Sequence, residues 1–370
     1  MLSTPDASSA MMAENDYHMF ASILSQPAEL LKAVERNVES AISFASKLKR
    51  SADCNLYLVG TGSSLHAAEI GAYFLRGAAY AHSPVRVMPI SSYEFVNYTP
   101  PLRKKDAVVV VSHRGYKSYS NSSLRMAVDS GCHVAAVTGF ESTISDSDAE
   151  HVMRTVGQEK SSAHTVSLTT ALGVLYSISV ALSMPEASAR KEAGSRMKQV
   201  SAMMEGVISD RESLRNTISG FGTIGRVWIT GSGPNKIVAR EGALKIQETC
   251  YLDAYGFEVE QMIHGPVRAA SITDDLFIPV IWGGVDRRSS GLASAIHDAG
   301  GKVMAISNTA AEKFNCIAGG FDLEENLSPF VTLIPMQLTA LYLAVLRGTN
   351  PDNFRKDEPH FAILDSKIKL

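Results

Sequence analysis

The sequence has little of what nucleic-acid-binding, metal-binding and disulfide-stabilised proteins need. Its 370 residues contain 35 Lys and Arg against 38 Asp and Glu, and the basic residues are scattered along the chain. Without an excess of positive charge, we expect no nucleic-acid partner. Four cysteines, Cys54, Cys132, Cys250 and Cys316, lie far apart, and the histidines show no paired ligand spacing. The sequence therefore predicts neither a metal site nor a disulfide framework.

Signals for a membrane or for secretion are also missing. The first residues, MLSTPDASSAMMAEND, have no basic start followed by an apolar core. No apolar run approaches the roughly 18 to 20 residues that a membrane span needs. We therefore expect a soluble, cytoplasmic protein with no membrane partner. Its length favours two packed domains.

Alternating strand and helix signals predict an α/β fold. Apolar residues at helical spacing run from about 16 to 50, and Pro27 in this stretch is interpreted as a helix start, so we expect an N-terminal helical arm. Short apolar runs then alternate with loops and helices, at 56–59, 85–90, 107–111 and 133–137. This alternation is typical of a doubly wound parallel sheet flanked by helices.

The second half of the chain repeats the first. A short apolar run precedes Gly60-Thr61-Gly62, and another precedes Gly231-Ser232-Gly233; two further strand signals match in order, at offsets that agree within two residues. We therefore expect two copies of one α/β unit. The predicted organisation is an arm at 1–50, a first domain at 51–195, a helical linker at 196–219, a second domain at 220–350 and a C-terminal tail at 351–370.

Two loops of the first half carry the donors that a phosphate needs. The turn from Gly60 to Ser64 follows a strand and opens a helix, where backbone N–H groups and the helix dipole favour an anion. The loop from Ser112 to Lys117 follows another strand and adds cations at the same predicted sheet edge. A packing turn and a solvated loop are the alternatives. Together the two loops favour a phosphorylated ligand, whereas the turn at Gly231 belongs mainly to the repeat.

The helix that begins near Pro234 carries charges on an apolar stripe. At 100° per residue, Glu241, Lys245 and Glu248 share a face with apolar residues. A solvated ladder of ion pairs is the alternative explanation for this spacing. Because an uncompensated buried charge is costly, charges kept on such a stripe favour a site. His264 follows on a Gly-Pro loop and is either an acid-base group or a structural histidine.

These residues together resemble the double sugar-isomerase (SIS) domain family. The resemblance is closest to the isomerase half of glucosamine-6-phosphate synthase and to related glucosamine-6-phosphate deaminases. It covers the chain from about residue 25 to the C-terminus and depends on an ordered set of motif residues: Glu241-Gly242-Ala243-Leu244-Lys245, Glu248, Tyr251, Glu260 and His264-Gly265-Pro266. It implies two tandem SIS domains and a C-terminal tail that completes the active site.

The resemblance also implies residue roles. Glu248 would move a proton between sugar C1 and C2 with Lys245 beside it, and Lys367 in the tail would form an imine with the sugar carbonyl. His264 would help to open the sugar ring from the neighbouring subunit, which implies a homodimer. Phosphate and sugar binding would fall to Gly62, Ser63, Ser64, Ser112, His113, Arg114, Lys117, Ser162 and His164. No metal or organic cofactor is expected.

The chain departs from the family pattern where the ligand binds. The family's Ser-Gln-Ser-Gly-Glu-Thr is replaced by the sequence from Ser112 to Lys117, and its Ser-Thr-Lys by His164-Thr165-Val166. Phosphate binding is therefore expected to depend on cations more than on hydroxyls. The chain begins Met1-Leu2, without an N-terminal cysteine, so we do not expect glutamine-dependent synthesis.

The sequence thus predicts an aldose-ketose isomerase or deaminase that acts on an amino-sugar phosphate. Glucosamine 6-phosphate, interconverted with fructose 6-phosphate and free ammonia, is the leading substrate. A fructosamine-phosphate deglycase or another ketose-phosphate isomerase would use the same groups. A non-catalytic phosphosugar-binding regulator is the alternative of another class, although it would need the phosphate turns and no proton shuttle.

Overall fold

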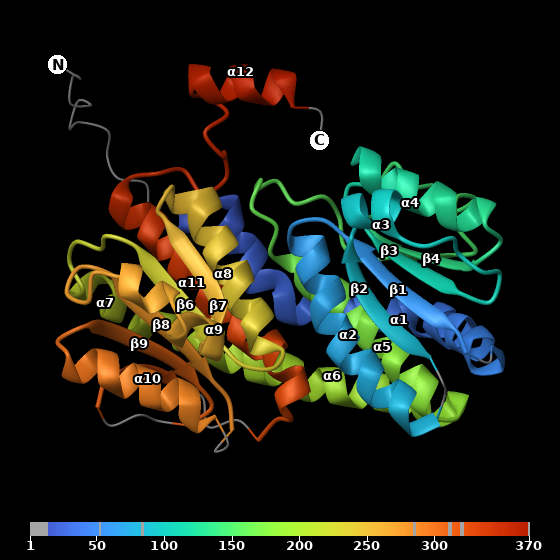
Figure 1. The fold of residues 1–370 in the computed structure, drawn as a ribbon, viewed down its shortest axis with the longest axis horizontal. Helices are drawn as coiled ribbons and strands as arrows, with labels where there is room; N and C mark the ends of the chain where they lie inside the picture. Colours follow the sequence, from blue (N-terminus) through green and yellow to red (C-terminus); the bar gives the residue numbers. More distant parts are fainter. Residues whose placement is uncertain are drawn as a thin grey trace.

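Two parallel five-stranded sheets, each covered by helices, form the protein (Figure 1). The computed structural model describes residues 14–51, 53–82, 85–283, 286–309, 313–318 and 322–368, and the predicted polar start at 1–13 lies outside these ranges. In the first sheet the strands lie in the order β2 (Arg86–Ser91), β1 (Asn55–Gly60), β3 (Ala107–Val111), β4 (His133–Thr138) and β5 (His151–Arg154). The second sheet has the order β7 (Ala254–Glu258), β6 (Val227–Gly231), β8 (Leu276–Ile281), β9 (Lys302–Ser307) and β10 (Asn315–Ala318).

The two sheets share one strand order, and each carries an equivalent buried carboxylate. Asp106, just before β3, accepts a hydrogen bond of 3.0 Å from the backbone N–H of Asn55 at the start of β1. Asp275, just before β8, accepts one of 3.0 Å from the N–H of Arg226 at the start of β6. Each carboxylate therefore ties two neighbouring strands at the same point. This equivalence agrees with the repeat inferred from the sequence.

Twelve α-helices and three 3-10 turns are found in the described residues. Those of the first half are α1 (His18–Arg50), α2 (Ser63–His82), α3 (Ser92–Tyr98), α4 (Ser118–Asp129), α5 (Val166–Ser183) and α6 (Glu186–Ser209). The second half adds α7 (Arg211–Gly220), α8 (Asn235–Cys250), α9 (Val259–Ile263), α10 (Arg287–Asp298), α11 (Ser328–Arg347) and α12 (Pro359–Lys367). The 3-10 turns are η1 (Glu14–Asp16), η2 (Pro266–Ala269) and η3 (Glu325–Leu327).

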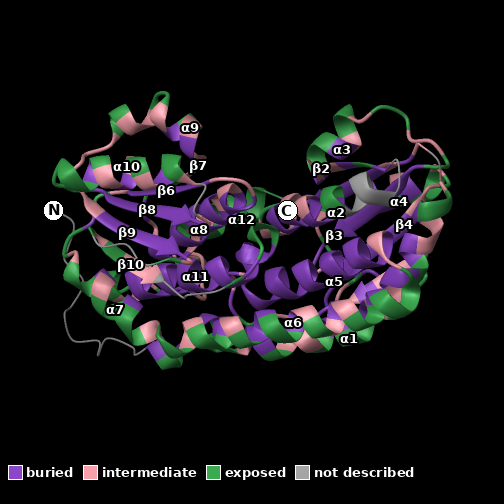
Figure 2. Ribbon diagram, turned by 90° about the horizontal axis from the view of Figure 1, so that it is seen from below, coloured by how far each residue is buried: buried purple, intermediate pink, exposed green. Residues whose placement is uncertain are grey.

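One apolar core joins the two halves. It includes buried side chains of α1, α2, α5 and α6 from the first half, and of α8 and α11 from the second. Two smaller clusters cover the outer faces of the sheets, one under α4 and one under α10. Figure 2 shows α5 and α11 as the buried centre of the molecule. Because the inner faces share one core, the two halves are held in a fixed relation.

Helices α5 and α11 are long and apolar enough, by composition, to cross a membrane, which we did not expect from the sequence. Their apolar windows have mean hydropathies of 1.6 and 1.7, and they are 94% and 89% buried within the protein. Helix α5 packs against α1 and α2, and α11 packs against α8. Their composition is therefore explained by their place in the shared core.

Two long helices contain an internal proline, and for α1 this differs from the prediction. Helix α1 begins at His18 and runs through Pro27, which is inside the helix and not its start. The carbonyl of Ile23, which Pro27 leaves without a backbone donor, accepts a hydrogen bond of 3.3 Å from Gln26 Nε2. Helix α11 likewise runs through an internal proline, Pro335. Burial of both helices outweighs the local cost of the prolines.

Candidate active site

A cavity of about 200 Å³ lies where the carboxyl ends of β1 and β3 meet α8 and the tail. Its walls contain Thr61, Gly62, Ser63, Ser64, Ser112, His113, Arg114, Tyr116, Lys117, Ser120, Ser162, His164, Lys245, Glu248, Phe354 and Lys356. All the predicted binding residues are among them, together with Lys245 and Glu248. The chain thus brings residues from both halves to one place, as expected for a ligand site at the carboxyl edge of a parallel sheet.

The floor of the cavity is the turn between β1 and α2. Gly62 has φ of +58°, which favours glycine. A Cβ on Gly60 would lie 2.5 Å from the backbone of Ser64, so the turn folds back tightly on the end of β1. Helix α2 begins at Ser63, and its N-terminus therefore points its dipole at the cavity. This is the geometry of an anion site.

The loop after β3 adds positive charge. Arg114 and Lys117 line the cavity, and Arg114 also donates a hydrogen bond of 3.3 Å to the hydroxyl of Tyr116. Ser112 is buried at the end of the strand and lines the same wall. Two cations and a hydroxyl therefore lie near the helix N-terminus. A phosphate dianion is a chemically matched ligand for this wall.

Two histidines pack against each other in the cavity. The rings of His113 and His164 meet edge to face, with centroids 5.3 Å apart. Burial lowers the pKa of both imidazoles, and for His164 the nearby His113 and Lys245 lower it further. Both rings are therefore neutral at pH 7. A neutral imidazole both donates and accepts a hydrogen bond, which suits sugar hydroxyls.

A buried carboxylate that we did not identify from the sequence holds the loop before α5. Glu159 accepts hydrogen bonds from the backbone N–H groups of Thr165 and Ser167, each at 2.9 Å, and from both hydroxyls. This clamp fixes the loop that carries Ser162 and His164. Nothing in the local sequence marked this role, because Glu159 lies several residues before the start of α5 at Val166.

The acid-base candidates lie on α8, inside the protein. The side chains of Glu241 and Lys245 are 0% and 1% exposed, and that of Glu248 is 23% exposed. Lys245 Nζ lies 2.5 Å from Glu248 Oε2 and 3.4 Å from Glu241 Oε1. The alternative of a solvated ion-pair ladder is therefore wrong. One buried ammonium is shared between a buried carboxylate and a carboxylate that faces the cavity.

The pKa values of Glu241, Lys245 and Glu248 are set by burial and by the electrostatic interactions among the three side chains. Burial raises the pKa of Glu248 above its ordinary value, and Lys245 only partly offsets that effect. For Glu241, burial alone would raise the pKa, but Lys245 and a hydrogen bond from His66 outweigh it and lower the pKa. Burial alone would lower the pKa of Lys245, but the two carboxylates outweigh it. The result is a charged Glu241–Lys245 pair beside a carboxyl that gains a proton more easily than usual.

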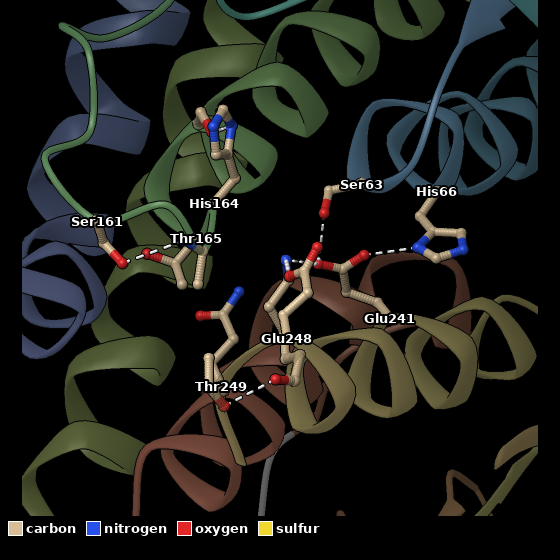
Figure 3. Close-up of polar contacts among 12 residues, drawn as sticks. Ser63, His66, Ser161, His164, Thr165, Glu241, Glu248 and Thr249 are labelled. Atoms are coloured by element: carbon tan, nitrogen blue, oxygen red, sulfur yellow. Dashed lines mark hydrogen bonds and ion pairs between the residues drawn. The ribbon is translucent and has the colours of Figure 1, made fainter. Parts of the chain in front are cut away.

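Helix α2 supplies the remaining partners of Glu241 (Figure 3). Ser63 Oγ donates to Glu241 Oε1 at 2.9 Å, and His66 Nδ1 lies 2.5 Å from Glu241 Oε2. Because a hydroxyl has a single proton, this contact leaves Ser63 with its backbone N–H for an anion, while Ser64 keeps its hydroxyl. His66 was missed from the sequence, since nothing local marks its partner on α8.

The structure separates His264 from the other candidates within one chain. His264 follows α9, its side chain is 75% exposed, and its Nε2 lies 3.3 Å from Glu260 Oε2. It does not line the cavity described above. Its place on the surface is compatible with a role at a neighbouring subunit, which stays a prediction.

Lys367 does not line the cavity, and its role as the tail lysine stays a prediction. It ends α12, an exposed helix that stands away from the two sheets (Figure 1). Lys356, eleven residues earlier, lines the cavity instead, and its Nζ donates to Ser162 Oγ at 2.8 Å. The sequence alone gave no reason to prefer it.

The tail crosses the cavity because Asp352 anchors it. The Asp352 carboxylate accepts hydrogen bonds of 2.8 and 2.9 Å from the N–H groups of His18 and Met19, at the N-terminus of α1. Its backbone carbonyl accepts one of 3.0 Å from the N–H of Ser162. These contacts hold Phe354 and Lys356 against the cavity, and the chain leaves toward α12 only afterwards.

In the second half of the chain, the side chain of Glu325 lies against the glycine turn that corresponds to the turn at Gly62. A Cβ on Gly233 would lie 2.8 Å from Glu325 Oε1, so this carboxylate lies directly against the turn. Burial and the nearby Asp286 raise the pKa of Glu325. A carboxylate at this position disfavours phosphate. The turn at Gly62 in the first half is therefore the better phosphate site.

Comparison with known proteins gives a consistent picture. Residues 48–181 match the model of the SIS domain. Among curated relatives, the glutamine–fructose-6-phosphate aminotransferase (isomerizing) of Aquifex aeolicus is 25% identical over 365 residues, which cover 96% of this chain and 59% of the relative. The corresponding protein of Chlorobaculum tepidum is 27% identical over 311 residues, covering 81% and 50%. The chain thus spans between 50% and 59% of the length of these two relatives.

Solved structures share the fold. The C-terminal domain of glucosamine-fructose-6-phosphate aminotransferase from Francisella tularensis superposes with a TM-score of 0.78 at 20% identity, covering 92% of this chain and 99% of that one. Tagatose-6-phosphate ketose/aldose isomerase from Escherichia coli gives 0.77 at 18%, covering 93% and 98%. Glucosamine-6-phosphate deaminase from Thermotoga maritima gives 0.68 at 18%, covering 91% and 97%.

The two tail lysines provide a test of the cavity. Lys356→Met removes a cation from its wall, so inorganic phosphate should bind roughly fivefold more weakly, as for the loss of one partly exposed ion pair. Lys367→Met, the matched control on α12, should bind phosphate like the parent protein. Isothermal titration calorimetry measures both constants. Equal affinities in the two variants would contradict the placement of the tail.

Proposed function

We propose that this chain, whose residues 48–181 match the SIS domain model, is a phosphosugar aldose-ketose isomerase or deaminase, with glucosamine 6-phosphate as the leading substrate. The observation that carries the proposal is Glu248. This carboxyl has a raised pKa, is paired with a buried ammonium, and faces a cavity whose other wall is built for phosphate. A base and a phosphate anchor on opposite sides of one cavity suit proton transfer on a phosphorylated sugar.

Binding begins at the phosphate. The turn amides around Gly62, with Ser64 and Ser112, donate to its oxygens, and Arg114 and Lys117 balance its charge. The sugar chain then extends toward α8, where Glu248 enters the cavity. His113 and His164 contact sugar hydroxyls as neutral imidazoles. This orientation places the carbon atoms far from the phosphate next to the base.

Chemistry then consists of proton transfers. Glu248 removes the proton from C2 of the open-chain aldose while the C1 carbonyl oxygen gains a proton, which gives an enolamine. Glu248 returns a proton to C1, and the C2 imine that results is hydrolysed by water to fructose 6-phosphate and ammonia. Lys356 of the tail adds a further cation to the cavity wall.

The raised pKa of Glu248 fixes the sign of the pH dependence. Glu248 acts as a base only when it is deprotonated, so activity falls as the pH drops through its pKa. Because burial raises that pKa, the loss begins at a higher pH than for an exposed glutamate.

A second candidate is a deglycase or isomerase acting on another ketose phosphate. Arg114, Lys117 and His164 favour it, since by the family resemblance they stand where hydroxyl side chains are expected, and all three line the cavity. A non-catalytic regulator is disfavoured. Burying the charges of Glu241 and Lys245 beside Glu248 costs free energy, and a protein that only binds phosphate has no use for this arrangement.

Replacing the base tests the proposal. The parent protein should release ammonia and fructose 6-phosphate from glucosamine 6-phosphate, and Glu248→Gln should lower kcat by about 10²- to 10⁴-fold, the usual contribution of a positioned acid-base group. A coupled assay for fructose 6-phosphate measures the rate. Binding without turnover in the parent protein, or full activity of Glu248→Gln, would refute a catalytic role.

The exposed His264 is explained if the protein is a homodimer. We propose that His264 reaches the cavity of the partner subunit and assists ring opening there. Its ring lies on the surface, with Nε2 3.3 Å from Glu260 Oε2. Glu248 and His264 of one chain would then serve two different active sites.

Mixing two inactive variants tests this arrangement. His264→Ala and Glu248→Gln proteins, refolded or co-expressed together, should recover up to about a quarter of the parent activity, because random pairing makes half of the dimers mixed and each mixed dimer has one intact site. Mass spectrometry of tagged chains measures the share of mixed dimers. Mixed dimers without activity would show that both residues act within one chain.

A further inference from the structure

Glu241 lies between the phosphate turn and the base, although it does not line the cavity. Its two carboxylate oxygens contact residues of α2, Ser63 at 2.9 Å and His66 at 2.5 Å. On its own helix it lies 3.4 Å from Lys245 Nζ, which in turn contacts Glu248. Figure 3 shows Glu241 directed from α8 toward α2, with Glu248 on the same helix.

Each partner of Glu241 belongs to a different part of the site. Ser63 is the first residue of α2, in the turn expected to receive the phosphate. Lys245 is the ammonium that shares its charge with Glu248. A shift of the turn on phosphate binding therefore acts directly on the hydrogen bond to Glu241. Lys245 Nζ lies 3.4 Å from Glu241 Oε1, so a change at Glu241 would also act on Lys245.

Stability alone does not explain this buried polar group. Replacing a buried set of charges by apolar side chains of similar volume is often neutral or stabilising. The surrounding core is apolar and continuous across α2 and α8. A fully buried glutamate at the contact of these helices is therefore retained at a cost, as expected for a residue that serves the site.

We propose that Glu241 is a positioning residue that couples phosphate binding in the first half to the orientation and charge of Glu248 in the second. The proposal rests on the proposed function, because it assumes that Glu248 is the base. Glu241 itself does not touch the substrate. It acts through Ser63 and His66 on one side and through Lys245 on the other.

The negative charge of Glu241 should have a measurable effect on the pKa of Glu248. Charged and titratable groups surround Glu248 on every side. They are Lys245 and Glu241 on α8, His113, Arg114 and Lys117 in the loop before α4, His164 just before α5, and Lys356 in the tail. Among these, Glu241 raises the pKa of Glu248. Without the charge of Glu241, Lys245 pairs with Glu248 alone and stabilises its deprotonated form. The pKa of Glu248 should then fall.

The same pair of helices offers a matched control. Glu69 on α2 pairs with Arg240 on α8 at 2.8 Å, one position from Glu241, but this pair is partly exposed and lies outside the cavity. Glu69→Gln removes one carboxylate between the same helices. It leaves Ser63, Lys245 and Glu248 untouched.

The experiment compares Glu241→Gln with Glu69→Gln across pH, using glucosamine 6-phosphate. We expect Glu241→Gln to lower kcat by roughly 100-fold, as for a small misplacement of a catalytic group, with KM within about threefold of the parent value. The acidic limb of its kcat/KM profile should move by roughly one unit to lower pH. Glu69→Gln should keep kcat, KM and the pH profile of the parent protein.

Outcomes separate this proposal from the proposed function. If the parent protein turns over the phosphosugar and Glu241→Gln matches Glu69→Gln, the coupling role is refuted while the proposed function stands. If the parent protein does not turn over any phosphosugar, the proposed function fails and the coupling role with it. If Glu241→Gln does not fold, as judged by circular dichroism, Ser63→Ala decides: a fall in kcat of about fivefold or more supports the coupling, and an unchanged kcat overturns it.

Discussion

The ion pair between Glu241 and Lys245 is the constraint on which the site depends. Both side chains are almost completely buried, and neither is stable there without the other. Glu241 needs donors from α2, and Lys245 needs a second carboxylate, Glu248, at the cavity. These contacts hold α2, in the first half, against α8, in the second half. The phosphate turn at the start of α2 is thereby held at a set distance from the base on α8.

Much of the fold followed from local pattern. Runs of apolar residues placed β1, β2, β3, β4, β6, β8 and β9, and these strands lie in two parallel sheets as expected. The short edge strands β5, β7 and β10 were missed, because they are weakly apolar and lie at or near the sheet margins. Pro27 was misinterpreted because its missing hydrogen bond is replaced by Gln26, a compensation that only the folded helix shows. The predicted domain boundary at residue 195 falls inside α6.

Residues whose role in the site depends on contacts between distant parts of the chain could not be identified from the sequence. Charges on an apolar stripe marked Glu241, Lys245 and Glu248, and turn chemistry marked Ser64 and its neighbours. His66 was not marked, since its partner is 175 residues away. Lys356 was not preferred over Lys367, since only the anchoring of Asp352 at α1 brings it to the cavity. The sequence repeat also did not reveal that the two glycine turns differ. In the second half, the side chain of Glu325 lies against the turn at Gly233.

Exchange of a substrate hydrogen with solvent tests the central claim, that Glu248 moves a proton on a phosphosugar, most directly. Fructose 6-phosphate and ammonium are incubated with the protein in deuterium oxide, and NMR follows the two hydrogens on C1. The account predicts that deuterium replaces one of the two hydrogens, and that Glu248→Gln abolishes this exchange. Fructose 6-phosphate that binds but keeps both hydrogens, or exchange that continues in Glu248→Gln, would contradict it.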